Sequence, residues 1–172
     1  MATLRLLFEV DGERALDRAF QDVGATIEAP ARKVAPVVEK WFYATEDEQF
    51  QSEGAKGASG RFPDLSKGYE ERKLRENPFA LYILQRRGEL KLSLTRAGVK
   101  YAVREVTDTE VVLGSTHPAA QAHQRGGGRL KQRKPIDPSE TQKRALVKDV
   151  QREVLVPIRR TGLVVTEGTD FI

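Results

Sequence analysis

The middle of the chain carries the pattern that most restricts its fold. Two strand-like runs, at about residues 99–106 and 110–114, are separated only by the turn residues 107–109. Such a short connection predicts an antiparallel hairpin. The segments on both sides instead carry apolar residues at helical spacing. We therefore expect an α+β fold, in which a small mixed or antiparallel sheet packs against two or more helices, with extended loops and a C-terminal arm.

The first third of the chain predicts one strand and two helices. Apolar residues alternate over residues 4–10, as in a strand with one buried face, and a helical pattern follows over residues 11–24. The second helix contains two prolines. Pro30 suits a helix start, whereas Pro36 should kink the helix or mark its true beginning. Trp41, the only tryptophan, lies in the apolar stripe of this helix, and we assign it to the core.

Three further helices are expected later in the chain. One opens at residues 64–66, where an aspartate or a serine can supply the cap. A short helix starts at Pro118 and stops at Gly126. The last helix opens with the capping-box sequence of residues 139–142 and docks one face on the body. Pro157 should end or kink it.

Two loops stand out by composition. Residues 52–60 are small, glycine-rich and without an apolar anchor, so they predict a mobile loop. The order Lys56-Gly57-Ala58 does not match the Gly-Lys-Ser/Thr of a Walker phosphate-binding loop. Residues 125–134 carry five Lys and Arg side chains and no aromatic residue. This composition argues against stacking on nucleic-acid bases and leaves non-specific phosphate contact open.

Length and composition favour one domain. A chain of 172 residues with 39% hydrophobic content can bury one core and is too short for two large ones. We expect a single domain over residues 1–156, with a flexible loop at about 52–62 and a basic loop at about 125–135, followed by a C-terminal arm over 157–172. Apolar runs are too short to span a membrane, and no cysteine is present, so we expect a soluble intracellular protein without disulfides.

Charge is unevenly distributed along the chain. Residues 1–60 contain seven Lys and Arg against eleven Asp and Glu, whereas residues 61–172 contain 22 against 14. This asymmetry is compatible with an ordinary solvated surface. It also suits complementarity between neighbouring subunits or toward DNA. We therefore hypothesise that the acidic first helices of one copy face the basic loop and the C-terminal helix of the next.

The two histidines do not form a recognisable metal site. His117 and His123 are six residues apart, not at the i, i+4 spacing that places two ligands on one helix face. His123 is expected to hydrogen-bond locally or across an interface. A hydrolase would need a nucleophile such as Ser115 beside His123, and only their nearness in sequence suggests that pairing. We assign no catalytic, cofactor-binding or metal-ligating residue and expect no cofactor.

One ordered series of residues resembles a known family. The series runs from near residue 50 to near residue 136 and comprises Phe62-Pro63, Leu65-Ser66, Tyr69, Lys73, Ile83-Leu84, Gly88, Leu90, Ser93-Leu94, Val112-Leu113-Gly114-Ser115, Ala120, His123-Gln124 and Gly126. Its order and spacing resemble the phage virion morphogenesis, or tail completion, family typified in Mu-like phages. Two features depart from the family pattern. Ala119-Ala120 replaces Tyr-Ala before His-Gln, and Arg133-Lys134-Pro135-Ile136 stands where the family tends to have Arg-Pro and an aromatic residue.

The resemblance implies a structural virion protein and no catalysis. Such a protein acts at the head-proximal end of the tail or in the neck, as a tail terminator or completion protein that helps head–tail joining. It implies a homo-oligomeric ring, with a hexamer as the expected form, that contacts the tail tube protein and head–tail connector proteins. The virion would be its location, after assembly in the host cytoplasm. A closed ring of identical copies needs complementary patches on opposite sides of each subunit.

Three hypotheses follow from the sequence. The first is the ring-forming virion protein, the second is a basic nucleic-acid-binding module, and the third is a small hydrolase centred on Ser115 and His123. No contact with membranes is expected, whereas non-specific contact with passing DNA stays open. The residues expected to face a neighbouring subunit or DNA are His123, Gln124, Arg125, Arg129, Lys131, Arg133 and Lys134.

Overall fold

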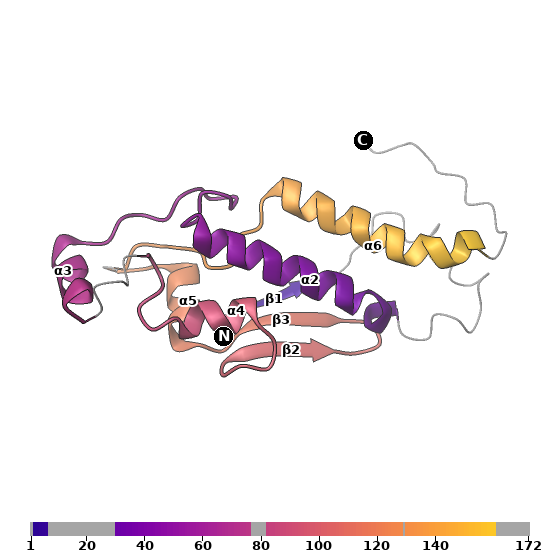
Figure 1. Cartoon of the computed structure of the whole chain (residues 1–172), viewed down its shortest axis with the longest axis horizontal. Coiled ribbons are helices and arrows are strands. Elements are labelled where there is room, and N and C mark those ends of the chain that lie inside the picture. The colour runs from indigo at the N-terminus through magenta and orange to yellow at the C-terminus, as the bar shows by residue number, and fades with distance from the viewer. Residues whose placement is uncertain (1, 7–29, 77–81, 129, 161–172) are drawn as a thin grey trace.

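The computed structural model describes residues 2–6, 30–76, 82–128 and 130–160. The α+β prediction is confirmed, because helices pack against a small antiparallel sheet (Figure 1). The elements in chain order are β1 (Ala2–Leu6), α2 (Pro30–Gln51), α3 (Lys67–Glu76), α4 (Glu89–Thr95), β2 (Ala102–Val106), β3 (Val111–Ser115), α5 (Pro118–Arg125) and α6 (Glu140–Arg160).

The sheet has the strand order β1-β3-β2, and both pairings are antiparallel. The predicted hairpin is therefore confirmed as β2 and β3, joined at a turn in which the Thr107 amide donates to the Glu110 carbonyl over 2.9 Å. Every residue of β3 is buried, since this strand has a neighbour on each edge. Figure 1 shows α2 lying along the sheet and α6 lying along α2, so the body has three layers.

The core lies between α2 and its neighbours. Phe42 of α2, Leu94 of α4 and Leu113 of β3 are at most 1% exposed, and Leu146 of α6 joins the same cluster. Trp41 packs against this cluster, as predicted, and its indole N–H also donates to the Gln142 carbonyl over 2.9 Å. This bond ties α2 to α6 and satisfies the only polar atom of the indole side chain.

Both interior prolines lie within helices. The structure starts α2 at Pro30 and continues it through Pro36, so the prediction that Pro36 could mark the helix start is wrong. The first turn of α2 is held by the Ala31 amide, which donates to the Asp108 carbonyl over 3.0 Å. The backbone of α6 likewise passes Pro157 and reaches Arg160. A proline removes one helical hydrogen bond, and packing of the rest of the helix can offset that loss.

Several of the predicted boundaries cannot be compared fully with the structure. The proposed domain limit at residue 156 falls inside α6, not at its end. The first strand is described only over residues 2–6. The helix predicted over residues 11–24 and most of the predicted C-terminal arm lie outside the described residues.

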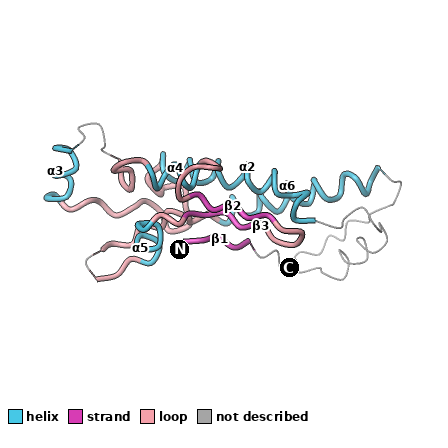
Figure 2. The backbone as a smooth tube through the Cα atoms, turned by 90° about the horizontal axis from the view of Figure 1, so that it is seen from below, coloured by secondary structure: helices cyan, strands magenta, loops and turns pink. Residues whose placement is uncertain are grey.

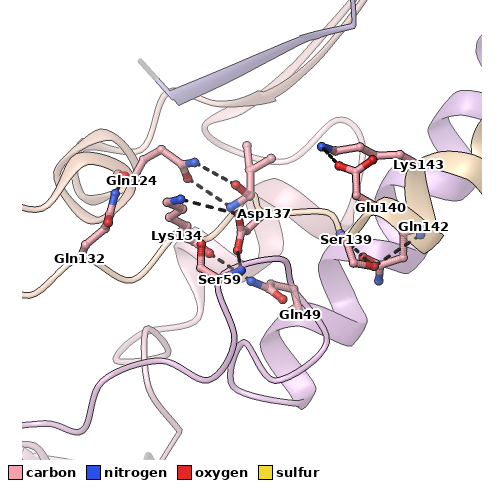
Figure 3. A network of polar contacts seen from close by, with 11 residues as sticks. Gln49, Ser59, Gln124, Gln132, Lys134, Asp137, Ser139, Glu140, Gln142 and Lys143 are labelled. Carbon is pink, nitrogen blue, oxygen red and sulfur yellow. Dashed lines mark hydrogen bonds and ion pairs between the residues drawn. The ribbon is translucent and has the colours of Figure 1, made fainter.

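The loop at residues 52–62 is tied down, contrary to the prediction of a segment without anchors. The Ala58 amide donates to the Asp137 carbonyl over 2.9 Å, and the Ser59 amide donates to the Asp137 carboxylate over 2.6 Å (Figure 3). Phe62 is buried against Gly54, where a Cβ would approach the phenyl ring to 2.6 Å. These anchors are backbone bonds to a distant segment and one aromatic side chain just after the glycine-rich stretch. Composition within the loop could not reveal them.

The molecule is elongated and has two different ends. The turn end is formed by the β2–β3 turn at residues 107–110 and by the start of α2 (Figure 1). The forked end is formed by α3 and by the loop that follows α5, at residues 126–128 and 130–132. Figure 2 shows α3 and this loop projecting on opposite sides of the same end. The candidate site lies between them.

Candidate functional site

Helix α5 positions one side of the site. The His117 imidazole accepts a hydrogen bond from the Ala119 amide over 3.2 Å and caps the helix, and Pro118 occupies its first turn. Gly126 ends the helix with a φ of 65°. A Cβ at this glycine would lie 2.8 Å from the Gln132 Cβ, so the returning chain passes too close for any other residue. The predicted start and stop of this helix are both confirmed.

The chain then returns alongside α5 and is bonded to it. The Arg133 amide donates to the His123 carbonyl over 3.0 Å, and the Gln132 side chain donates to the Gln124 carbonyl over 2.9 Å. The Gln124 side chain makes two bonds to the backbone of Ile136, donating over 2.8 Å and accepting over 3.2 Å (Figure 3). Gln124 is therefore partly exposed and holds the returning chain within the subunit, and its place at an interface stays a prediction. A carboxamide carries both a donor and an acceptor, so it can bond the amide and the carbonyl of one residue as a neighbouring strand would.

Arg133 is also directed inward. Its side chain is 7% exposed, and its guanidinium donates to the Pro63 carbonyl over 2.8 Å and to the Asp64 carbonyl over 2.9 Å. Burial lowers the pKa of Arg133 from its ordinary value, although the guanidinium group of an arginine stays protonated in proteins. Arg133 is therefore not one of the freely exposed cations of the basic loop, although it contributes to the lining of the pocket described below. This side chain instead fastens the segment before α3 to the loop after α5.

The remaining predicted residues differ in exposure. Arg125 and Lys131 are exposed, as expected. Lys134 is partly buried, and its ammonium lies 3.9 Å from the Asp137 carboxylate. Its carbonyl also accepts a bond from the Gln49 side chain over 3.2 Å (Figure 3). Arg129 lies outside the described residues.

His123 is partly buried, and a bond from its side chain across an interface stays a prediction. Its Nδ1 atom is buried and has no hydrogen-bond partner within the part of the chain that the structure describes. Burial lowers the pKa of His123, and the nearby charges of Arg133 and His117 lower it further. Both effects favour the neutral imidazole.

A pocket of about 670 Å³ lies between the two projections of the forked end. Both histidines line it, together with residues from α3, from the segment before α4 and from the loop after α5. Sequence reasoning did not find this pocket, since its walls come from segments far apart in the chain. The adjacent Arg86 and Arg87 were the only local signal. Its apolar lining comprises Leu65, Ile83, Leu84, Leu90 and Leu130.

The pocket has a net positive lining, with five Lys and Arg side chains against two Asp and Glu side chains. Lys73 is 3% exposed and donates to the Tyr82 carbonyl, and burial lowers its pKa. Arg86 forms a two-pronged ion pair with Glu76, with both bonds at 2.7 Å. Arg87 and Lys131 are exposed at the rim and have no ion-pair partner among the described residues. These two cations are available to a ligand.

Ser115 does not meet His123. Its side chain is fully buried, and its hydroxyl is 2.7 Å from the Ser93 hydroxyl and accepts a bond from the His117 amide over 3.0 Å. A nucleophile needs access to its substrate and a base within hydrogen-bond reach, and Ser115 has neither in this conformation. Within the described ranges, no group of three or more His, Asp or Glu side chains could hold a metal ion.

The acidic residues of α2 are largely neutralised within the chain. Asp47 lies 3.0 Å from Lys91, and Glu39 lies 2.7 Å from Arg104. Ion pairs inside one subunit thus neutralise part of the charge difference between residues 1–60 and residues 61–172. The other acidic residues of the first third of the chain lie mainly in residues 7–29, outside the described part of the chain.

Comparisons of the chain with protein-family models, with curated proteins and with solved structures found no match. The resemblance to the tail completion family therefore rests on the series of residues alone. In the described segments, no helix combines the length and the apolar character needed to cross a membrane.

Proposed function

We propose that this chain is a structural virion protein of a tailed bacteriophage. Copies of it form a ring at the head-proximal end of the tail or in the neck, where the ring completes or terminates the tail and helps join it to the head. Tail tube and head–tail connector proteins are its partners in this proposal, and a hexamer is the expected ring.

The observation that carries the proposal is how the family-like residues are used. Ser93 and Ser115 hydrogen-bond each other in the core, Gln124 holds the backbone of Ile136, and Gly126 allows the close approach of Gln132. Other members of the series, among them Leu65, Tyr69 and Leu90, line the pocket at the forked end. The series therefore both holds the fold together and shapes a largely apolar surface. This use supports a framework that presents surfaces to other proteins, rather than a reaction centre.

The two ends of the molecule suit a ring. Head-to-tail closure needs two different patches that are complementary and lie on opposite sides of a subunit. The turn end and the forked end are built from different elements, and the long body separates them (Figure 1). A two-fold dimer would instead use one patch twice.

Contact with passing DNA is a smaller part of the proposal. Of the basic loop, Arg125 and Lys131 are exposed, whereas Arg133 is bonded inside the fold. So few described cations favour weak, non-specific phosphate contact over a dedicated nucleic-acid-binding module. Binding to duplex DNA that falls steeply with salt, without any oligomer, would favour that alternative function.

Removing the gene from a phage that carries it tests the proposal. We expect host cells to accumulate filled heads without tails, or tails of abnormal length, when examined by electron microscopy. Supplying the protein in trans should restore infectious particles. Normal particles in the absence of the protein would contradict the proposed role.

A further inference from the structure

We propose that the pocket at the forked end binds residues 8–24 of a second copy of this chain. The inference rests on the proposed head-to-tail assembly and names the contact that would build it. It does not depend on where in the virion the assembly acts.

The pocket selects for an apolar segment with acidic side chains. Leucine and isoleucine side chains form much of its wall, so an apolar surface is needed to displace water from it. Arg87 and Lys131 at the rim, together with the net positive lining, favour carboxylates beside that apolar surface. A nucleic acid would satisfy the charges but not the apolar wall.

Residues 8–24 have this composition. They contain five Asp and Glu against two Arg, the mirror image of the pocket lining. Their pattern predicts an amphipathic helix, with Asp17 and Asp22 among its polar positions. The apolar positions are Ala15, Leu16, Ala19, Phe20 and Val23, preceded by Phe8 and Val10.

The topology places the described residues that flank this segment and the pocket at opposite ends of the subunit. Leu6, which precedes the segment, pairs with Val111, and Ala31, which follows it, donates to the carbonyl of Asp108. Both attachment points therefore lie at the turn end. The pocket residue Ile83 is instead bonded to Glu53, just beyond the far end of α2.

This placement favours binding to a neighbour over binding within one chain. Reaching its own pocket would require the segment to pass about 17 Å along β1 and to return about 33 Å along α2. A helix over residues 11–24 covers about 21 Å, so the nine other residues between Leu6 and Pro30 would have to be almost fully extended. A neighbouring copy removes this constraint. The contact is heterologous, so repeating it closes a ring or continues as a filament.

Disulfide trapping tests the contact directly, since the chain has no cysteine of its own. Full-length Ala19→Cys carrying one tag is mixed with full-length Leu130→Cys carrying another, under mild oxidation. We expect a cross-linked pair that contains both tags. The matched control replaces the second partner with Val147→Cys, whose side chain is also exposed but lies on α6. Equal cross-linking to residues 130 and 147 would overturn the inference.

The double variant Ala19→Cys/Leu130→Cys separates binding between copies from binding within one chain. Binding between copies predicts a ladder of covalent oligomers on a denaturing gel. A product that stays monomeric, with its disulfide closed inside one chain, would overturn the assignment to a second copy.

Charge reversal provides an independent test in solution. We expect Arg87→Glu/Lys131→Glu to weaken self-association by about tenfold or more, measured by mass photometry across a dilution series. Adding Asp17→Lys/Asp22→Lys in the same chain should restore it. The control Arg144→Glu/Lys148→Glu reverses two exposed charges on α6 and should leave association unchanged.

These outcomes separate the two proposals. A wild-type chain that remains monomeric at every concentration overturns the proposed assembly. A wild-type chain that assembles, and does so equally well with the pocket charges reversed, overturns only the assignment of this contact. If only the α6 control, Arg144→Glu/Lys148→Glu, loses assembly, the contact lies on that helix and the assignment to the pocket is wrong.

Discussion

Arg133, Lys73 and Glu46 are buried although their side chains are ionisable. Arg133 and Lys73 donate to backbone carbonyls, and these bonds compensate for the removal of charge from water. Residue type alone predicts exposure for such side chains. The sequence therefore placed Arg133 with the exposed cations of the basic loop, because its two acceptors lie about 70 residues earlier in the chain.

Replacing Arg133 distinguishes a structural role from a binding role. We expect Arg133→Ala to lower the free energy of unfolding by about 2–4 kcal/mol, because two bonds from a charged donor are lost and the Pro63 and Asp64 carbonyls lose their partner. Urea denaturation followed by circular dichroism measures the change. The neighbouring Lys131→Ala should stay within about 0.5 kcal/mol of the wild type, since Lys131 is exposed. Equal stability of the two variants would contradict the assignment.

Glu46 makes stability depend on pH. It is 1% exposed, and its Oε2 atom has no hydrogen-bond partner among the described residues. Burial raises the pKa of Glu46 well above its usual 4.5, and the charge of Asp137 raises it further. The folded state therefore holds the proton more tightly than the unfolded state. Its contribution to stability is complete below pH 4.5 and is lost as the pH rises through the raised pKa.

Glu46→Gln tests this dependence, because the amide cannot ionise. We expect the melting temperature of Glu46→Gln, compared with that of the wild type, to rise steadily as the pH is raised from 4 to 8. The comparison should be least favourable to the variant at pH 4. Glu70→Gln, an exposed change on α3, should track the wild type at every pH. A gap between wild type and Glu46→Gln that does not change with pH would rule out a raised pKa.

At the scale of elements, the sequence predicted features that depend on neighbouring residues and missed those that depend on contacts between distant segments. The β2–β3 hairpin, the limits of α5 and the capping box of α6 depend on residues a few positions apart, and the sequence predicted all three. Proline and glycine signals were correct at Pro30, Pro118 and Gly126, but they did not show that two helices continue past a proline or that the glycine-rich loop is anchored. The backbone passes both Pro36 and Pro157 in helical form, and contacts to Asp137 hold the glycine-rich loop.

The capping box of α6 should contribute measurably to stability. The Ser139 hydroxyl accepts from the Gln142 amide over 3.4 Å, and the Gln142 side chain accepts from the Ser139 amide over 2.8 Å. We expect Ser139→Ala to cost about 1 kcal/mol in urea denaturation, because one amide at the helix start loses its acceptor. Thr141→Ala, an exposed change in the same turn, provides the control. An equal effect of both changes would mean that the cap contributes nothing of its own.

At the scale of the whole molecule, the candidate site could not be read from the sequence. The forked-end pocket combines residues 64 to 90 with residues 117 to 133, and no spacing rule connects these ranges. The charge asymmetry was visible in the sequence, but the structure shows that pairs such as Asp47–Lys91 consume part of it inside the subunit.

The central claim is that copies of this chain assemble into a closed ring. Electron microscopy of the purified full-length protein, with native mass spectrometry of the same sample, tests it most directly. We predict rings of one diameter and a single dominant oligomer mass, with dissociation in molar salt because charge sets the contact. A protein that stays monomeric at high concentration and low salt, or that forms only two-fold dimers, would contradict the claim.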